Sequence, residues 1–276
     1  MHGRSHLYVP GDRGDRQAKA FSRGADALIV DLEDAVRPAA KLGARQLVAE
    51  WLATIDRPGV PVWVRINPGE LREGDVRAVA VASSLTGLVV AKAERVDELI
   101  DLDRLLTSMG SKARVAPLVE SAVGVVNAVS IAAGPRVSVL HLGEVDLAAD
   151  LRITPSADEH EWLYVRSQVV LASRAAGIDA PVAPVSVNFT DVERFQESSH
   201  ALRNLGFGGR ACIHPAQVAV ANGAFSPTPE ELRWAKGIVS HHGSDSMSAT
   251  RDAAGNMIDE AVLRRARDLL TVAATQ

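Results

Sequence analysis

Residues 137–150, VSVLHLGEVDLAAD, combine the two features that decide the fold of this chain. The run 137–142 is apolar and β-branched, which predicts a buried strand, and the segment after it has the apolar spacing of a helix. Two acids, Glu144 and Asp146, stand where the strand ends. A buried, ionised carboxylate without a partner costs several kcal/mol or becomes neutral. We therefore expect a positive group near these acids.

The same alternation of a short apolar run and a longer helical segment recurs along the chain. Eight runs predict strands, at residues 7–9, 27–31, 61–66, 87–91, 114–119, 137–142, 181–187 and 210–213. Apolar residues near i, i+3 and i+4 predict helices between them, over residues 39–53, 95–109, 122–133, 160–176 and 191–205. Alternating elements force parallel strands covered by helices, so the pattern predicts an α/β protein with a closed (βα)8 barrel over residues 1–224. The absence of a G-x-G-x-x-G after the first strand argues against an open dinucleotide-binding sheet.

The character of the sequence changes after residue 224. Residues 226–239 begin with prolines and acids suited to a helix start, and residues 240–256 are polar, small and rich in turn formers. The last segment, 259–274, has one apolar stripe made of Val262, Leu263, Ala266, Leu269 and Leu270. We expect residues 225–276 to form a C-terminal extension, a mobile loop plus a helix that docks on its own barrel or on a neighbouring subunit.

Composition and charge exclude several classes of partner. The net charge is −4, the pI is about 6.1 and aromatic residues make up 4%, so there is no basic field or stacking platform for nucleic acid. The single cysteine, Cys212, cannot close an intrachain disulfide, and the N-terminus lacks the apolar core of a signal peptide. The most apolar long stretch, 121–134, falls short of the roughly 20 residues that cross a bilayer. We expect a cytoplasmic protein with neither nucleic acid nor membrane as a partner.

Charged residues stand at the ends of the predicted strands, where parallel barrels carry their catalytic groups. They are Asp31, Glu33, Asp34, Arg65, Lys92, Glu94, Glu120, Glu144 and Asp146. Glu120 and Asp146 come from adjacent strands and are candidates for a Mg²⁺ site, because Mg²⁺ is usually held by one or two carboxylates and keeps other positions for water and substrate. Arg65 is placed to bind a substrate carboxylate or a developing oxyanion. The structural alternative is that these charges form ion pairs, with Arg65 neutralising Asp31 or Glu33.

Other motifs with catalytic meaning are absent from the sequence. There is no HExxH, no Cys-Cys-His cluster, no Walker loop and no G-x-S-x-G elbow. Zinc hydrolysis, P-loop chemistry and serine esterase chemistry therefore lose support. His141 has apolar neighbours and is expected to be a core histidine, and His214, which precedes Pro215, is expected to shape a turn.

Seven motifs together carry a family resemblance that spans almost the whole chain. They are RSHLYVPGDR (4–13), DLEDAV (31–36), VRIN (64–67), PLVESAVGVVNA (117–128), LGEVDLAADL (142–151), GFGGRACIHPAQ (206–217) and GNMID (255–259). In this order they resemble the citrate lyase beta-subunit-like members of the HpcH/HpaI aldolase superfamily. The resemblance implies a TIM barrel, usually a homotrimer, that binds Mg²⁺ and cleaves or forms a carbon–carbon bond in a β-hydroxyacyl-CoA such as malyl-CoA or citramalyl-CoA. CoA then enters as part of the substrate, with a 2-oxo acid as the other small molecule.

The resemblance also implies roles for individual residues. Glu120 and Asp146 match the metal carboxylates, and Arg65 of VRIN matches the arginine that binds the 2-oxo or hydroxy carboxylate. Arg13 of PGDR and Lys19 match positions that contact the CoA phosphates, although both could simply be solvated charges on a first helix. The residues expected to contact the substrate are Arg65, Glu120, Gly143 and Glu144. Three acids are expected to lie beside these residues and to hold them in place: Asp31, Glu33 and Asp34.

Asp259 of GNMID matches an aspartate that a neighbouring subunit delivers through its C-terminal segment. In that role it is the general acid/base for the thioester enolate. It also stands just before an amphipathic helix, where Asp is a favoured N-cap worth about 1 kcal/mol. The base that takes the hydroxyl proton stays open among Glu33, Asp34 and a metal-bound water.

Two alternatives compete with the CoA lyase. The first is a CoA-independent class II aldolase of the same superfamily acting on a hydroxy 2-oxo acid, which the long segment 225–276 and the lack of a matching early-strand histidine disfavour. The second is a barrel without activity of its own, or a beta subunit that works only inside a citrate lyase complex with an acyl-carrier protein. The sequence leaves open the acyl group, the stereochemistry, the direction of the reaction and whether thioester hydrolysis follows.

Overall fold

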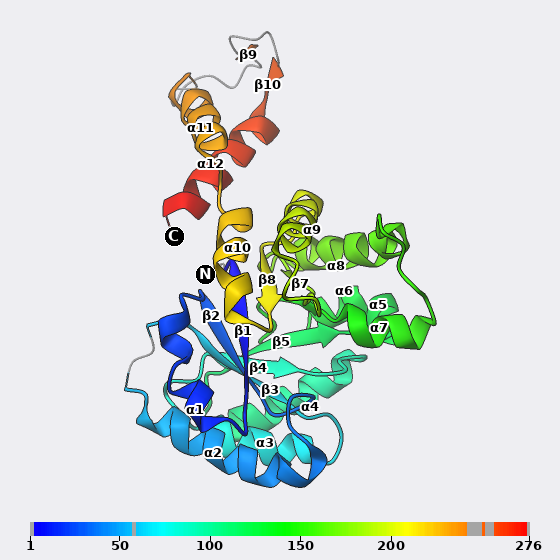
Figure 1. The fold of residues 1–276 in the computed structure, drawn as a ribbon. Coiled ribbons are helices and arrows are strands. Elements are labelled where there is room, and N and C mark those ends of the chain that lie inside the picture. Colours follow the sequence, from blue (N-terminus) through cyan, green and yellow to red (C-terminus); the bar gives the residue numbers. More distant parts are fainter. Residues whose placement is uncertain (1–2, 57–58, 242–249, 252–256, 275–276) are drawn as a thin grey trace. The chain divides into compact units, whose positions relative to one another are not determined.

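A computed structural model describes residues 3–56, 59–241, 250–251 and 257–274 of the chain. The chain forms two compact units, Gly3–Phe225 and a C-terminal unit that begins at Ser226. The larger unit is a closed barrel in which eight parallel strands follow one another in chain order (Figure 1), as the alternating pattern predicted. The strands are β1 (Ser5–Pro10), β2 (Ala27–Asp31), β3 (Val62–Ile66), β4 (Gly87–Val90), β5 (Arg114–Val119), β6 (His141–Leu142), β7 (Val182–Ala183) and β8 (Gly209–Cys212).

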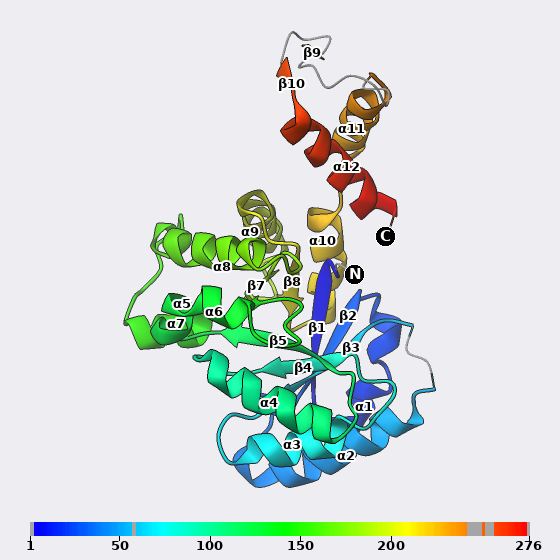
Figure 2. The ribbon, with the colours of Figure 1, turned by 180° about the vertical axis from the view of Figure 1, so that it is seen from behind.

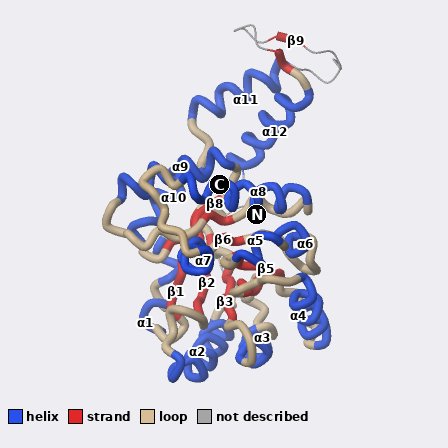
Figure 3. Tube along the Cα trace, turned by 90° about the vertical axis from the view of Figure 1, so that its right-hand side faces the viewer, coloured by secondary structure: helices blue, strands red, loops and turns tan. Residues whose placement is uncertain are grey.

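Helices surround the strands, which form the inner layer of this unit (Figure 3). The α-helices are α1 (Gly14–Gln17), α2 (Lys41–Thr54), α3 (Leu71–Val79), α4 (Val96–Ser108), α5 (Ala122–Val126), α6 (Ala128–Ala132), α7 (Glu144–Leu151), α8 (Leu163–Ala175), α9 (Val192–Leu205) and α10 (Pro215–Phe225). Three short 3₁₀ segments lie at η1 (Ala20–Arg23), η2 (Pro38–Ala40) and η3 (His160–Trp162). The longer helices bury apolar residues against the outer face of the barrel, as Val48 and Leu52 of α2 do.

Side chains alternate along each strand between the barrel interior and the helix layer. On β2, Leu28 and Val30 pack with the helices, while Ala27 and Ile29 join an interior cluster that also contains Trp63. This period of two is the geometry of a pleated strand. Trp63 fits inside because its neighbour across the sheet is a glycine: a Cβ on Gly87 would stand 2.4 Å from the Trp63 ring.

Two predicted strands are shorter in the structure than the apolar runs that indicated them. Of the run 137–142 only His141 and Leu142 form a strand, and Val137 adds an isolated bridge to Val115. The run 181–187 contributes only Val182–Ala183. Pro184 follows immediately and has no N–H to donate to a neighbouring strand, which explains why β7 ends there.

The helix expected over residues 122–133 is divided in two at Asn127. This residue has φ −91° and ψ 5°, outside the helical region, and separates α5 from α6. Its side-chain amide donates a hydrogen bond to the main-chain oxygen of Glu94, 2.9 Å away. A tertiary contact therefore interrupts a helix that the apolar spacing alone would continue.

The C-terminal unit contains two helices, α11 (Pro229–His241) and α12 (Glu260–Ala274), and a two-stranded antiparallel sheet of β9 (Thr250–Arg251) and β10 (Met257–Ile258). The helices pack against each other (Figure 2) around Ala235, Ile238, Leu263 and Ala266. Leu263 and Ala266 belong to the apolar stripe predicted for this helix. Most of the segment 240–256, predicted to be a mobile loop, lies outside the described residues. Among the described helices none combines the length and the apolar character needed to cross a bilayer.

Candidate active site

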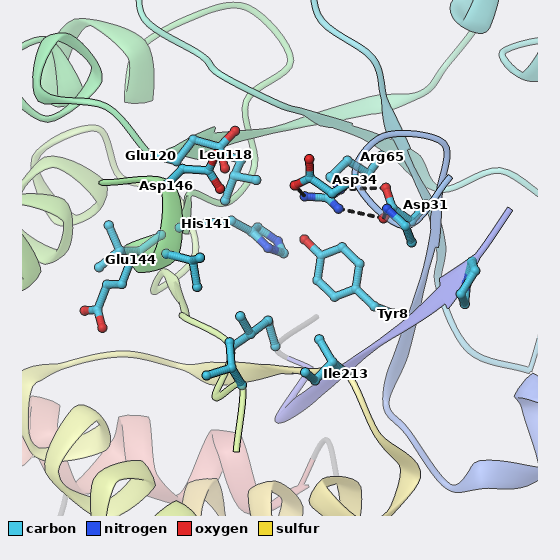
Figure 4. Close-up of a pocket in the computed structure, with 18 of the residues that line it drawn as sticks. Tyr8, Asp31, Asp34, Arg65, Leu118, Glu120, His141, Glu144, Asp146 and Ile213 are labelled. Atoms are coloured by element: carbon cyan, nitrogen blue, oxygen red, sulfur yellow. Dashed lines mark hydrogen bonds and ion pairs between the residues drawn. The ribbon is translucent and has the colours of Figure 1, made fainter. Parts of the chain in front are cut away.

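The interior side chains change from apolar to charged at the carboxyl ends of the strands. On β2 the interior series Ala27, Ile29 is followed two residues later by Asp31, and on β5 the series Ala116, Leu118 is followed by Glu120. Because side chains of residues i and i+2 point to the same face of a strand, these acids point into the barrel mouth. The same alternation brings Tyr8, Arg65 and His141 to this mouth (Figure 4).

Arg65 is held by three carboxylates. Its Nε and Nη2 donate to the two oxygens of Asp31, both at 2.6 Å, and both side chains are buried. Its Nη1 lies 3.1 Å from Glu33 Oε2 and donates to Asp34 Oδ2 at 3.3 Å. The guanidinium carbon also lies 5.0 Å from the centre of the Tyr8 ring. The ion pair that the sequence offered as a structural alternative for Arg65 is therefore formed, and it fixes the plane of the guanidinium.

Glu33 and Asp34 differ in their surroundings although they are adjacent in the chain. The Glu33 side chain is buried, and this burial raises its pKa to about 7 against the lowering effect of Arg65. The Asp34 side chain is 57% exposed and lines the cavity described below. Of the two carboxylates proposed as a base, Asp34 is the one that reaches the cavity.

A set of polar contacts supports this charged group from behind. Lys41 Nζ donates to the main-chain oxygens of Leu32 and Glu33, at 3.1 and 2.9 Å, and to Asn67 Oδ1. Asn67 in turn donates its main-chain N–H and its side-chain amide to Asp75, at 2.9 and 2.7 Å. These contacts tie the loop after β2 to the end of β3, so the positions of Glu33 and Arg65 are mutually fixed.

Glu120 is a buried carboxylate to which no cationic side chain of the described residues is bound. Its Oε1 accepts the main-chain N–H of Lys92 at 2.7 Å, and within the described part of the chain no donor is bound to Oε2. Burial raises the pKa of Glu120 to about 7, and the neighbouring Asp146 carboxylate contributes to this rise. A buried carboxylate whose ionisation a neighbouring carboxylate opposes favours a cation between the two groups.

The residue beside Glu120 on the next strand has to be a glycine. Val119 and Leu142 are paired in register, so Glu120 and Gly143 follow as neighbours. A Cβ on Gly143 would stand 2.7 Å from Glu120 Cβ and 2.9 Å from Glu120 Oε2. Gly143, which the sequence indicated as a substrate contact, therefore makes the space that the Glu120 carboxylate occupies.

Asp146 and Glu144 both stand in the first turn of α7, but their carboxylates have different partners. Asp146 lies beside Glu120 (Figure 4) and its Oδ1 is 3.4 Å from Lys92 Nζ. Glu144 is turned away from that pair and forms a two-bond ion pair with Arg166, at 2.7 and 2.9 Å. The positive group expected near these acids is therefore an arginine of α8 for Glu144. Glu144 also lines the cavity described below, so its contact with the substrate stays a prediction, with its carboxylate paired to Arg166.

These residues surround one cavity of about 370 Å³. Its charged lining includes Asp31, Asp34, Arg65, Glu120 and Asp146, and its apolar lining includes Val185, Val187, Ala211 and Ile213 from β8 and the loops after β7 and β8. Within the described residues no three His, Cys, Asp or Glu side chains converge as metal ligands. The donor set at the mouth is therefore the pair Glu120 and Asp146, which suits an ion that keeps most of its positions for water and substrate.

The remaining predicted residues lie away from this cavity or in the other unit. Arg13 is exposed and pairs with Asp15 at 2.9 Å, Lys19 is exposed as well, and neither lines the cavity. Asp259, in the C-terminal unit, accepts the main-chain N–H of Val262 at 2.9 Å. This contact is the N-cap that its place before the helix predicted.

Sequence reasoning missed several residues that the fold brings to the site. Tyr8 and Arg16 line the cavity, Lys92 contacts the carboxylate pair, and Arg166 binds Glu144.

His141, predicted to be a core histidine, is buried with its ring edge-on to His6 and also lines the cavity. Burial lowers the pKa of His141 well below its usual value, so its ring is neutral. Lys92 was visible at a strand end, but nothing in the sequence singled out Arg166 inside a helix.

Comparisons with known proteins agree with this geometry. The chain is 32% identical to the citrate lyase subunit beta of Leuconostoc mesenteroides subsp. cremoris, covering 98% of this chain and 93% of that protein. It is 35% identical to a (3S)-malyl-CoA thioesterase of Cereibacter sphaeroides, covering 84% of this chain and 80% of that protein. The crystal structure of CitE from Mycobacterium tuberculosis in complex with magnesium, acetoacetate and coenzyme A is similar over 99% of both chains, with a TM-score of 0.82 and 31% identity. The HpcH/HpaI aldolase/citrate lyase model matches residues 4–215, and the chain therefore belongs to this family of lyases and aldolases.

Proposed function

We propose that this protein is a Mg²⁺-dependent carbon–carbon lyase. It cleaves a β-hydroxyacyl-CoA, such as citramalyl-CoA or malyl-CoA, to acetyl-CoA and a 2-oxo acid, or forms it from these two compounds. The observation that carries the proposal is that the Glu120–Asp146 pair and Arg65 face one cavity at the barrel mouth. Relatives named for citrate lyase and malyl-CoA chemistry, and a similar structure that holds magnesium, acetoacetate and coenzyme A, support it.

The residues present fit a magnesium ion. Glu120 Oε2 has no donor within the described residues, the missing side chain of Gly143 leaves it room, and Asp146 lies beside it. A cation there would relieve the repulsion that helps to raise the pKa of Glu120. When bound, the ion supplies a Lewis acid that stabilises negative charge on substrate oxygens.

Arg65 is suited to bind the carboxylate of the 2-oxo acid portion. Asp31 holds Nε and Nη2 rigidly, so Nη1 is the part of the guanidinium that a substrate can use. Its weakest partner is the exposed Asp34, at 3.3 Å, which a substrate carboxylate would replace. The apolar wall of Val185, Val187 and Ile213 on the other side of the cavity suits the uncharged part of the acyl group.

The proton steps need two groups. For the substrate hydroxyl, Asp34 is the favoured protein base because it lines the cavity, whereas Glu33 does not. Tyr8 also lines the cavity, and burial raises the pKa of its phenol, so it remains a hydrogen-bond donor. For the thioester enolate we propose Asp259 of a neighbouring subunit in a homotrimer, with the enolate carbon taking its proton in the cleavage direction.

Contacts with CoA are proposed for the basic residues after β1. Arg13 and Lys19 are exposed, and Arg16, which lies between them in the chain, lines the cavity. We therefore propose Arg16 as a third basic residue of this segment that can bind a CoA phosphate.

A second candidate is the beta subunit of a citrate lyase. The 32% identity with such a subunit over 98% of this chain favours it. In that case the chain acts on a citryl group carried by a partner protein and shows no turnover of free acyl-CoA.

One assay panel tests the proposal. The isolated protein is treated with EDTA and offered citramalyl-CoA, malyl-CoA, citryl-CoA and a free hydroxy 2-oxo acid, with and without MgCl₂, and the release of acetyl-CoA and 2-oxo acid is followed. Mg²⁺-dependent cleavage of an acyl-CoA supports the lyase. Release of pyruvate from the free acid alone would favour the aldolase, and absence of all turnover would favour the subunit.

A further inference from the structure

Lys92 contacts both carboxylates of the proposed metal site. It lies two residues after the end of β4. Its main-chain N–H donates to Glu120 Oε1 at 2.7 Å, and its Nζ is 3.4 Å from Asp146 Oδ1. One residue thus reaches both acids, the first with its main chain and the second with its side chain.

The backbone of Lys92 is in the left-handed region, with φ 52°. A residue with a Cβ pays roughly 1–2 kcal/mol to adopt this conformation, and such residues persist where their surroundings determine them. Here the conformation delivers the N–H to Glu120. Glycine would meet that need without strain, so the main chain alone does not account for a lysine at this position. The ammonium group needs its own explanation.

We propose that Lys92 fixes Glu120 through its main-chain N–H and weakens the hold of Glu120 and Asp146 on a divalent cation through its ammonium group. This inference rests on the proposed function, which places the cation at these carboxylates. The ammonium group of Lys92 neutralises part of the negative charge of Asp146 and repels the divalent cation that the two carboxylates would bind. The Lys92 and Asp146 side chains are 46% and 38% exposed, so solvent screens the effect and keeps it modest.

A weakened carboxylate pair changes how much of the affinity for the ion comes from the substrate. Mg²⁺ keeps several positions for water and substrate oxygens, so its total affinity depends on what the substrate adds. With Lys92 present, the carboxylate pair alone would hold the ion somewhat less tightly, and the substrate oxygens would supply a larger share of the total affinity.

Calorimetric titration of the EDTA-treated full-length protein with MgCl₂ tests the ammonium group. Lys92→Met removes the charge and keeps the length of the side chain, and we expect it to lower the Mg²⁺ dissociation constant about threefold at low ionic strength. The difference should shrink when KCl is raised to about 0.5 M, because salt screens exposed charges. Arg95→Gln is the matched control: it also removes one positive charge, but that side chain pairs with Asp97 and both are about two-thirds exposed. We expect no change for it.

A second pair of variants tests the main chain. Lys92→Gly and Lys92→Ala both lack the ammonium, but only glycine adopts φ 52° without strain. Lys92→Gly should therefore melt at a higher temperature than Lys92→Ala while binding Mg²⁺ as tightly as Lys92→Met.

The outcomes separate this inference from the proposed function. If wild type binds Mg²⁺ and Lys92→Met binds it equally or more weakly, the role of the ammonium is overturned and the metal site stands. If wild type and Lys92→Met both fail to bind Mg²⁺, the metal site itself is overturned together with the role of Lys92.

Discussion

Asp31 and Arg65 lie opposite each other in register on neighbouring strands, and their side chains form a buried ion pair with two N–H···O bonds of 2.6 Å. Strand pairing sets their separation, so both groups are in place before any ligand arrives. A planar guanidinium held along one edge presents its remaining N–H groups in a fixed direction. Pre-organisation of this kind is what recognition of a carboxylate needs.

The two aspartates that contact Arg65 should differ sharply in their contribution to stability. Asp31→Asn leaves a buried guanidinium without its main counter-ion and should lower the free energy of unfolding by about 3 kcal/mol. Asp34→Asn removes a partner that is 57% exposed and should lower it by less than about 0.5 kcal/mol. Urea denaturation of both variants measures the difference. Equal losses would mean that Arg65 does not depend on Asp31 as the structure indicates.

Gly143→Ala should displace the Glu120 carboxylate. The added Cβ would stand 2.7 Å from Glu120 Cβ, which real contacts do not show, so one of the two strands has to shift. A displacement of this size at the reacting centre should lower kcat/KM about a hundredfold and weaken Mg²⁺ binding. Gly43→Ala in α2 is the control, because nothing lies within 4 Å of its Cβ. It should stabilise the protein by about 0.5–1 kcal/mol without loss of activity. Full activity of Gly143→Ala would contradict the placement of Glu120.

Metal-free protein should lose stability as the pH rises through 7. Burial raises the pKa of Glu120 from its ordinary 4.5 to about 7, so the folded state binds a proton that the unfolded state releases. The protonated Glu120 carboxyl makes its full contribution to the free energy of unfolding below about pH 4.5. This contribution is lost as the pH rises from about 4.5 to 7. Glu33, whose pKa is also raised to about 7, contributes in the same direction.

Glu120→Gln removes this titration while keeping an acceptor for the Lys92 N–H. At pH 8 the variant should therefore be more stable than metal-free wild type, by up to about 3 kcal/mol. Melting temperatures measured from pH 5 to 8, with EDTA and with MgCl₂, check this. Wild type should gain stability from MgCl₂ at pH 8, and Glu120→Gln should gain less. A pH profile of stability that is the same for both proteins would show that Glu120 titrates normally.

Replacements of Asp259 separate its two proposed roles. Asp259→Ser keeps an N-cap acceptor for the Val262 N–H but has no carboxyl, so turnover should fall by about 10²–10⁴-fold with stability nearly unchanged. Asp259→Ala should lose turnover to the same extent and also about 1 kcal/mol of stability. Steady-state kinetics and thermal unfolding of both variants give the comparison. Normal turnover in Asp259→Ser would leave Asp259 with a capping role alone.

The sequence was sufficient to predict the barrel because the pattern that specifies it, a short apolar run followed by a helical segment, is local and repeats along the chain. Eight apolar runs separated by helical spacing define eight parallel strands whatever their loops do, and the limits predicted for β2 and β5 agree with the structure. One error arose where a tertiary contact decided, and another where a proline stands inside an apolar run. Asn127 bonds to the main chain of Glu94 and divides a helix, and Pro184 ends β7 early.

The candidate site shows the same division between local and tertiary information. The sequence alone determined that acids and one arginine stand near the ends of the strands, because Asp31 closes one apolar run, Arg65 is next to last in another and Glu120 follows a third. It did not determine which partner each charge takes. Glu144 and Asp146 are two residues apart at the start of one helix, where successive side chains turn by about 100° and point in different directions.

Only the tertiary structure decided that Glu144 binds Arg166 while Asp146 lies beside Glu120, because α8 and β5 are distant in the chain and meet α7 only in the folded barrel. For the same reason the sequence could not indicate that Lys92 reaches both Glu120 and Asp146. Residue type and periodicity fix what a segment can form, whereas the partner of a charge depends on which segments the fold brings within a few ångströms of it.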